Sequence, residues 1–468
     1  MLFNSLVFVV FLIVVVVGHW ALPKLRWQNY FLLVTSLFFY GYGDYRFLAL
    51  LLFSTVVSYG AALAMARFPA YRKLALWLGV SICLALLFVF KYYDFFVTAV
   101  AASSAAIGLP LHPATLRIAL PIGISFFTFQ AIGYMADVYR GRSAAEADFA
   151  TYLLFKAFFP QLVAGPIERS SNLLRQIKLP RRLTPGDVTY GCWYILQGYV
   201  KKIVIADNLA PMVNLIFAQD DVDGSLVFAA LLGFAFQIYG DFSGYTDIAR
   251  GVARLLGFRL LLNFWHPYRA RNPADFWRRW HITLSNWFRD YVYIPLGGNR
   301  LGGVRTATNL FATMTLSGLW HGAALNFVLW GAYHGLLLVA HRGLAGLCGW
   351  RGEQAHGVGA GLARAAMFLC TLYGWMLFRV TDVDRIVDYT VALCSDWSAS
   401  LLGALVLAQM AVFIVMALVI DAVEARLVIP ARHKLRAGPW LAPAYATMVA
   451  VILVFIASVS GEFIYFKF

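Results

Sequence analysis

Apolar runs long enough to cross a lipid bilayer recur along the whole 468-residue chain. A helix needs roughly 20 predominantly apolar residues to span ~30 Å of hydrocarbon. The clear runs begin near Leu2, Phe31, Phe47, Leu74, Leu116, Leu226, Leu325, Gly361, Leu401 and Leu441. Hydrophobic residues make up 61% of the chain and charged residues 13%, whereas soluble domains are about a quarter charged. The sequence therefore predicts an all-α, polytopic integral membrane protein with about 10 to 13 transmembrane or re-entrant helices.

The chain is expected to form one integral membrane domain over residues 1–468. Residues 1–115 are predicted to be N-terminal spans, residues 116–345 a core with interfacial helices, and residues 346–468 C-terminal spans. The first run lacks a basic flank and a cleavage site, so we expect a retained helix. The apolar runs of the core are interrupted at Pro121, Pro160, Gly165-Pro166 and Pro180. Broken helices at membrane depth are tolerated only where protein or a cavity covers the freed backbone groups, so the interruptions indicate a cavity.

Charge is distributed unevenly over the chain, whose net charge is +15. Basic residues gather at residues 67–73, 169–182, 250–305 and 426–436, and an acidic run lies at residues 219–223. Under the positive-inside rule the basic loops lie in the cytoplasm and the acidic loop lies outside, which places both termini outside. Because the basic residues flank apolar spans and form no recognisable nucleic-acid module, we expect no nucleic-acid partner.

A charged and aromatic segment, residues 275–291, resembles neither a lipid-facing helix nor a solvated loop. Its aromatic residues recur at helical spacing: Trp277, Trp280, Trp287 and Tyr291. Trp and Tyr favour the headgroup level of a membrane. With its start at Asn272-Pro273, the segment predicts an amphipathic helix in, or dipping through, the cytoplasmic interface. A turn is expected at residues 295–300 and a helical hairpin or re-entrant pair at residues 306–340.

His321 lies near the middle of that predicted hairpin, in an almost uncharged stretch. A histidine at membrane depth is costly and is rarely kept for packing alone. An imidazole that is neutral near physiological pH can accept a proton where a carboxylate or lysine is hard to desolvate. Gly318, Gly322 and Ala323 leave room for another group beside the ring. The stretch predicts an enzyme in which His321 is a general base; the alternative is a histidine bonded to a backbone carbonyl between helices.

His281, within the aromatic basic segment, has two open interpretations: a structural interfacial histidine and a second catalytic group. A zinc site built from His266, His281, His321 and His334 lacks a supporting His-Glu-x-x-His or Cys-x-x-Cys spacing, so no metal is expected. The five cysteines follow neither a disulfide nor a zinc pattern.

Two acidic residues, Asp241 and Asp247, lie inside an apolar run. Acids at membrane depth are expensive unless they are paired. Arg250, Arg278 or Arg279 are the candidate partners. Bracing of a polar cavity is favoured over direct catalysis as the role of the two acids.

Arginines are more numerous in the core than membrane topology requires. They are Arg250, Arg254, Arg259, Arg269, Arg271, Arg278, Arg279 and Arg289. Guanidinium groups suit anionic lipid headgroups, and equally the phosphates of a nucleotide-like donor such as coenzyme A. The sequence leaves both open.

These motifs together resemble the membrane-bound O-acyltransferase family, and within it the bacterial branch that acetylates alginate and cellulose. The matching segments are residues 1–5, 121–130, 159–167, 200–209, 237–247, 276–281 (Phe-Trp-Arg-Arg-Trp-His), 317–322 (Ser-Gly-Leu-Trp-His-Gly) and 463–468. They run from end to end of the chain. Relatives usually end in Gln-Phe, so Lys467 is a departure, with no clear consequence.

The resemblance implies a ring of tilted helices around a thin core, with cytoplasmic and periplasmic funnels that meet at His321. It implies an O-acetyltransferase of the bacterial inner membrane that takes an acetyl group from cytoplasmic acetyl-CoA and binds no permanent cofactor. The implied partners are periplasmic acetyltransferase and accessory proteins of a polysaccharide-export complex, together with membrane lipids.

The resemblance also implies roles for particular residues. His281 is identified as the second family histidine, which orients the donor or stabilises the oxyanion. Arg278 and Arg279 are expected to hold the phosphates of the donor. The expected supporting residues are Trp280, Asn286, Asp241 and Trp320.

Three other functions remain as alternatives. The first is another acyltransferase reaction, in which the protein transfers D-alanine from a carrier-protein thioester. Interrupted helices and midplane polar residues are also typical of secondary transporters, although the chain has no related pair of halves. A scaffold that only assembles a polysaccharide-export complex is the third alternative.

Overall fold

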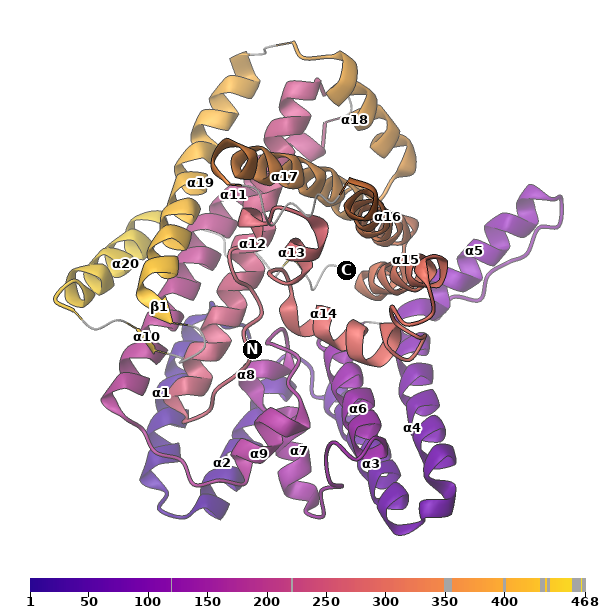
Figure 1. The fold of residues 1–468 in the computed structure, drawn as a ribbon. Helices are drawn as coiled ribbons and strands as arrows, with labels where there is room; N and C mark the ends of the chain where they lie inside the picture. Colours follow the sequence, from indigo (N-terminus) through magenta and orange to yellow (C-terminus); the bar gives the residue numbers. More distant parts are fainter. Residues whose placement is uncertain are drawn as a thin grey trace. The chain divides into compact units, whose positions relative to one another are not determined.

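The computed structural model describes residues 1–118, 120–219, 222–348, 356–398, 401–429, 434–435, 438–456 and 464. The described chain is almost entirely helical (Figure 1), and its strands are the two-residue pair β1 (Val428–Ile429) and β2 (Lys434–Leu435). The all-α prediction is confirmed. The chain packs into two compact units, residues 1–184 with 252–261, and residues 185–251 with 262–468. The expectation of one domain over residues 1–468 stays a prediction.

The first unit is built from the N-terminal helices. They are α1 (Leu6–Ala21), α2 (Leu25–Gly41), α3 (Arg46–Arg67), η1 (Pro69–Tyr71), α4 (Arg72–Leu87), η2 (Phe88–Tyr92), α5 (Tyr93–Ala106), α6 (Ile124–Tyr139), α7 (Phe149–Ala157), α8 (Phe159–Leu162), η3 (Ser170–Leu174) and α9 (Arg175–Ile177). Phe3, Phe8, Phe39 and Phe159 form part of its core. The apolar run that begins near Leu116 becomes helical only at α6, after Pro121, because proline and the residue before it disfavour a helix interior.

The second unit contains the remaining elements. They are α10 (Pro185–Tyr199), η4 (Val200–Ala206), α11 (Asp207–Phe217), α12 (Gly224–Leu255, whose last residues pack with the first unit), η5 (Pro267–Arg269), α13 (Pro273–Trp277), α14 (Ile282–Phe288), η6 (Arg289–Tyr293), α15 (Gly303–His321), α16 (Leu325–Cys348), α17 (Gly357–Arg379), α18 (Val383–Ser395), α19 (Leu401–Leu427), the β1–β2 pair and α20 (Leu441–Phe455). The predicted turn at residues 295–300 is confirmed.

Five of the helical stretches within the described residues are long and apolar enough to cross a membrane. They are Arg46–Arg67, Pro69–Ala106, Gly224–Leu255, Gly357–Arg379 and Gly403–Leu427, and α1 and α20 are shorter apolar helices. The protein is therefore a polytopic membrane protein, while the total of about 10 to 13 spanning or dipping segments stays a prediction. The apolar window of α12 is 83% buried and that of α19 is 28% buried. α12 is thus a core helix, and α19 has a wide apolar face for lipid.

The predicted helical hairpin is confirmed as α15 and α16, which pack along each other. Glycines let the two backbones approach closely, as small residues do between membrane helices. A Cβ on Gly318 would overlap the carbonyl oxygen of Phe327, and one on Gly331 would lie 2.5 Å from the Met314 oxygen. α15 ends at His321, three residues after Gly318.

The predicted amphipathic helix over residues 275–291 is wrong as a continuous element. Its start is confirmed, because the side chain of Asn272 accepts a hydrogen bond from the Asp275 amide and caps α13. The helix ends after Trp277, and α14 begins only after His281, whose φ of 41° lies in the left-handed region. A non-glycine residue in that region interrupts a helix.

Candidate active site

His321 is enclosed by aromatic rings and only 4% of its surface is exposed. Its ring centroid lies 4.8 Å from that of Trp320, 4.9 Å from Trp330 and 5.2 Å from Phe378. The three pairs are steeply inclined, at 69°, 85° and 77°, the edge-to-face geometry that aromatic quadrupoles favour. The imidazole is thus held in one orientation by apolar neighbours.

Asn326, five residues after His321, fixes one of those neighbours. Its side-chain nitrogen donates to the carbonyl oxygens of Leu377 and Phe378, each at 3.2 Å. These carbonyls belong to the last turn of α17, where a helix leaves its C=O groups without intrahelical partners. The contact therefore ties the end of α17, with the Phe378 ring, to the hairpin that carries His321.

His281 is fully buried between α13 and α14 and is held by a side chain from a distant part of the sequence. The Oδ1 atom of Asn263 lies 3.1 Å from His281 Nδ1, 2.9 Å from Thr283 Oγ1 and 3.3 Å from the Thr283 amide. A backbone N–H can only donate, so the contacting atom of Asn263 is its oxygen and Nδ1 of His281 carries the proton. Burial lowers the pKa of His281 to about 3. The ring is therefore neutral, with Nε2 as the acceptor nitrogen.

The indole of Trp320 lies near both histidines. Its ring centroid is 4.8 Å from that of His321 and 6.1 Å from that of His281. Trp280 belongs to the same aromatic wall through Phe264, which lies 4.9 Å from Trp280 and 6.2 Å from His281. The structure thus brings together four of the predicted site residues, His281, His321, Trp280 and Trp320.

Asp241 and Asp247 are paired chiefly with lysines that sequence reasoning missed. Lys202 lies 2.7 Å from Asp241, and Lys201 lies 2.7 Å from Asp247. Of the three predicted arginine partners, Arg250 is confirmed, at 3.6 Å from Asp247. The lysines lie in η4, a π-helical segment. Both lysines lie within residues 200–209, one of the segments that resemble the family. Their positive charge beside an apolar run was the sequence feature that could have indicated buried ion pairs.

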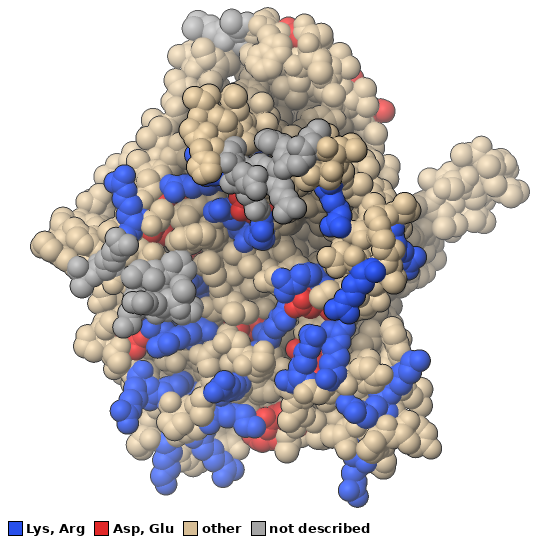
Figure 2. Space-filling view, viewed as in Figure 1, with Lys and Arg blue, Asp and Glu red and all other residues tan. Residues whose placement is uncertain are grey.

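The predicted donor-binding arginines differ in their surroundings. Arg279 is half-buried, with Nε 2.8 Å from Asp275 Oδ1 and Nη1 3.5 Å from the Trp265 carbonyl oxygen. Arg278 is exposed, and Asn286 is half-buried on α14. Lys and Arg outnumber Asp and Glu on the face drawn in Figure 2. Roles for Arg278, Arg279 and Asn286 stay predictions.

Comparison with known proteins decides the family. The model described as the membrane-bound O-acyltransferase family matches residues 141–348. The probable alginate O-acetylase AlgI of Pseudomonas putida is 38% identical over 411 residues, which are 86% of this chain and 82% of that protein. The chain belongs to the membrane-bound O-acyltransferase family.

Other relatives show how the similarity is spread. The peptidoglycan O-acetyltransferase of Helicobacter pylori is 37% identical over 379 residues, 73% of this chain and 70% of that protein. The teichoic acid D-alanyltransferase of Bacillus subtilis is 30% identical over 248 residues, 50% of this chain and 61% of that protein.

Membership of the membrane-bound O-acyltransferase family makes this protein an O-acyltransferase, as the sequence predicts. The transporter and scaffold alternatives are therefore wrong. Both histidines lie within the matched residues 141–348. Asn263 also lies there, and its role was missed because nothing local connects it with a histidine 18 residues away.

Proposed function

We propose that this O-acyltransferase passes an acetyl group from cytoplasmic acetyl-CoA across the bacterial inner membrane, for O-acetylation of an exported polysaccharide of the alginate or cellulose type. The observation that carries the proposal is the pair of buried histidines, His281 and His321, whose rings lie 6.1 Å and 4.8 Å from the same indole, that of Trp320. Similarity to an alginate O-acetylase over 86% of the chain favours acetyl transfer. Similarity to a D-alanyltransferase extends over only 50%, so D-alanyl transfer is the less favoured alternative.

His321 acts as the general base in this proposal. The acceptor hydroxyl oxygen attacks the thioester carbonyl carbon, and a C–O bond forms as the C–S bond breaks. The imidazole takes the hydroxyl proton and returns it to the departing thiolate, so the products are an O-acetyl ester and free thiol. General base catalysis contributes about 10²- to 10⁴-fold to such a step.

His281 orients the acyl donor. Two roles were predicted for it, and the tautomer set by Asn263 favours the first. An oxyanion needs a hydrogen-bond donor, whereas Nε2 of neutral His281 is an acceptor. An acceptor at Nε2 is compatible with a hydrogen bond from an amide N–H of the acyl donor. It is less compatible with stabilisation of an oxyanion, which needs a hydrogen-bond donor.

The donor's phosphates are expected at Arg278, an exposed residue directly after α13, because a guanidinium group suits phosphate oxygens. Arg279 is expected to contribute less, because Asp275 already engages it. Periplasmic acetyltransferase and accessory proteins would receive the acetyl group and complete its transfer to the polymer. No permanently bound cofactor is required for this chemistry.

The proposal is tested by His321→Ala in a strain whose exported polymer depends on this protein for acetylation. We expect acetate released from the polymer by mild alkali, per amount of protein in the membrane, to fall at least about 100-fold, since the base is lost. His356→Ala is the matched control, because His356 is an exposed histidine outside the site, and it should acetylate normally. Thermal unfolding in detergent checks that both variants fold.

Two results would contradict the proposal. Full acetylation by a well-expressed His321→Ala protein would remove His321 from the chemistry. Release of D-alanine instead of acetate from the product of the natural protein would leave the histidine pair in place and change the acyl group.

A further inference from the structure

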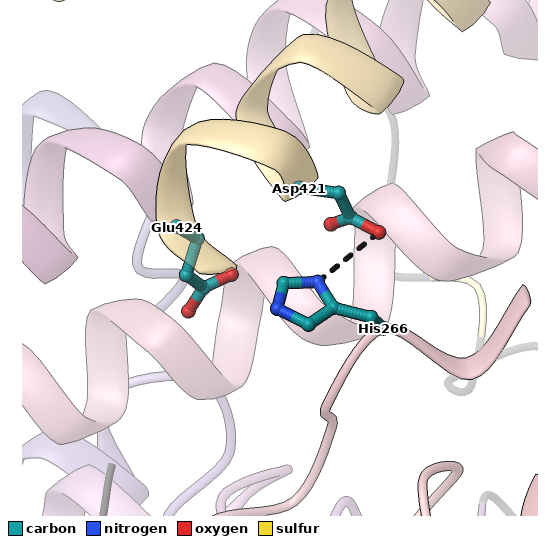
Figure 3. Close-up of side chains that lie close together, drawn as sticks. All are labelled: His266, Asp421 and Glu424. Atoms are coloured by element: carbon teal, nitrogen blue, oxygen red, sulfur yellow. Dashed lines mark ion pairs between the residues drawn. The ribbon is translucent and has the colours of Figure 1, made fainter. Parts of the chain in front are cut away.

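A separate group of polar side chains converges in the second unit. His266 immediately precedes η5, and Asp421 and Glu424 lie three residues apart near the end of α19, so they share one face of that helix. One ligand atom from each of the three lies within 4.8 Å of the others. Figure 3 shows the imidazole between the two carboxylates, with Nδ1 3.4 Å from Asp421 Oδ2. It is the one such group of buried His, Cys, Asp or Glu within the described residues.

The two carboxylates are held in place by tyrosine hydroxyls. Tyr239 donates to Asp421 Oδ1 at 2.8 Å, and Tyr194 donates to Glu424 Oε1 at 3.1 Å. Carboxylates that bind metals are typically hydrogen-bonded in this way. His266 is 98% buried, leaving 2% exposed, yet its Nε2 has no hydrogen-bond partner among the described residues. A buried acceptor or donor without a partner is costly, so this nitrogen needs a ligand.

The charges around the group do not balance. Lys201 lies 2.7 Å from Asp247 and 3.4 Å from Glu424, and Arg250 lies 3.6 Å from Asp247. With Asp421, the described residues of this group comprise three buried carboxylates and two buried cations. An uncompensated charge in a protein interior is strongly unfavourable. One more positive charge at the group would remove the imbalance.

We propose that His266, Asp421 and Glu424 bind one divalent transition-metal ion, with Zn²⁺ the best match. Imidazole nitrogen and carboxylate oxygen are zinc ligands, and three protein ligands leave a position for water. Zinc bonds to these atoms are about 2.0–2.2 Å long, so two ligands of one ion lie at most roughly 4.4 Å apart. The three ligand atoms here all lie within 4.8 Å of one another, so shifts of a few tenths of an ångström close the site.

The ion would join the segment that holds His281 to α19. Asn263, which fixes the tautomer of His281, lies three residues before His266. Backbone hydrogen bonds from Trp265 to Arg279 and from Ile282 to Asn263 connect the two segments further. The metal would therefore position the His281 region without touching the acyl donor or acceptor. His266 lies 155 residues before Asp421 in the sequence, so no spacing motif predicts the complete ligand set.

The test measures metal directly, on the full chain purified in detergent without a polyhistidine tag. We expect about one equivalent of zinc per chain by mass spectrometry. Replacing it with Co²⁺ should give visible absorption bands of a nitrogen and oxygen site, which EDTA removes. Asp421→Asn and His266→Gln should retain less than about a tenth of the natural metal content, because each removes a ligand. His19→Gln is the control, since His19 is a buried histidine of the first unit, and it should retain the full content.

The proposal fails if the natural protein, grown with added zinc, carries less than about a tenth of an equivalent and takes up no Co²⁺. Equal metal content in the natural protein and in Asp421→Asn also overturns it. Should a variant not fold, the Co²⁺ spectrum of the natural protein and its reversal by EDTA decide alone.

Discussion

The side chain of Asn263 forms hydrogen bonds through its oxygen, Oδ1. Within the described part of the chain its Nδ2 has no hydrogen-bond partner, while Oδ1 accepts from His281 and twice from Thr283. The amide therefore serves as a fixed acceptor beside a buried imidazole. Because His281 sits in a left-handed backbone conformation, the ring orientation depends on this one contact rather than on a regular helix. Strained backbone of this kind clusters at functional sites.

Asn263→Ala is predicted to lower the acyl-transfer rate and to weaken binding of the acyl donor. Without the Asn263 oxygen, the proton of His281 is free to move from Nδ1 to Nε2. Nε2, which we propose accepts a hydrogen bond from the acyl donor, then becomes a hydrogen-bond donor. We expect kcat to fall by about 10- to 100-fold, in line with the loss of a group that orients a functional histidine. KM for acetyl-CoA should rise by about 2- to 10-fold, because the hydrogen bond from the acyl donor to Nε2 is lost. Both follow from initial rates at varied acetyl-CoA.

Asn263→Asp is the companion variant, because it keeps an oxygen acceptor for all three donors. It should recover most of the rate that Asn263→Ala loses. A merely structural role for Asn263 would instead lower the amount of folded enzyme in both variants and leave kcat per folded molecule unchanged. Thr283→Val, which removes only one of the three contacts, should behave nearly as the natural protein.

The hairpin α15–α16 illustrates what local pattern predicts well at the scale of an element. An apolar stretch between two basic loops, with glycines near its middle, predicted two helices joined beside His321, and the structure has them. The apolar runs elsewhere likewise predicted the positions of most long helices. The segment at residues 275–291 failed because its break depends on Asn263, which no periodicity within the segment reveals.

Gly318→Ala is predicted to destabilise the protein and to displace His321. The added Cβ would overlap the Phe327 carbonyl oxygen and approach the Gly331 Cα to 2.9 Å, and backbone cannot move aside as a flexible side chain does. Overpacking of this kind costs about 1–3 kcal/mol. We expect a lower thermal unfolding temperature in detergent and a lower acyl-transfer rate.

Gly343→Ala on α16 is the matched control for that variant. A Cβ there meets nothing within 4 Å, so the change should be neutral or stabilise the helix by up to about 1 kcal/mol, since alanine is the better helix former. Equal unfolding temperatures for the two variants would show that the hairpin does not depend on the close crossing.

Charge pairing is the part of the whole molecule that the sequence predicted least. The sequence predicted that Asp241 and Asp247, which are costly to bury, need partners of opposite charge. It did not predict that these partners are lysines of η4. His266 contacts Asp421 of α19, which lies more than 150 residues later in the sequence. No sequence motif links the two residues. Such partners become visible only when the helices are packed.

Within the second unit, the arrangement of the loops agrees with the predicted membrane topology. The start of α12, beside the acidic run, contacts the segment before α19 through the Gly224 amide and the Asp396 oxygen, at 2.7 Å. The opposite end of α19 leads into the basic residues near β1 and packs on α10 through Val428. α12 and α19 thus run in the same direction, from acidic to basic ends, as the positive-inside rule requires if both cross the membrane.

The exposed Cys394 should therefore lie outside the cytoplasm. In a variant with the other four cysteines replaced by alanine, we expect a membrane-impermeant maleimide to label Cys394 in intact cells. In a cysteine-free background, Arg426→Cys, at an exposed position near the end of α19, should be labelled only after the membrane is permeabilised. The reverse pattern would invert the second unit in the membrane, and His321 would then have to receive its thioester from the opposite side.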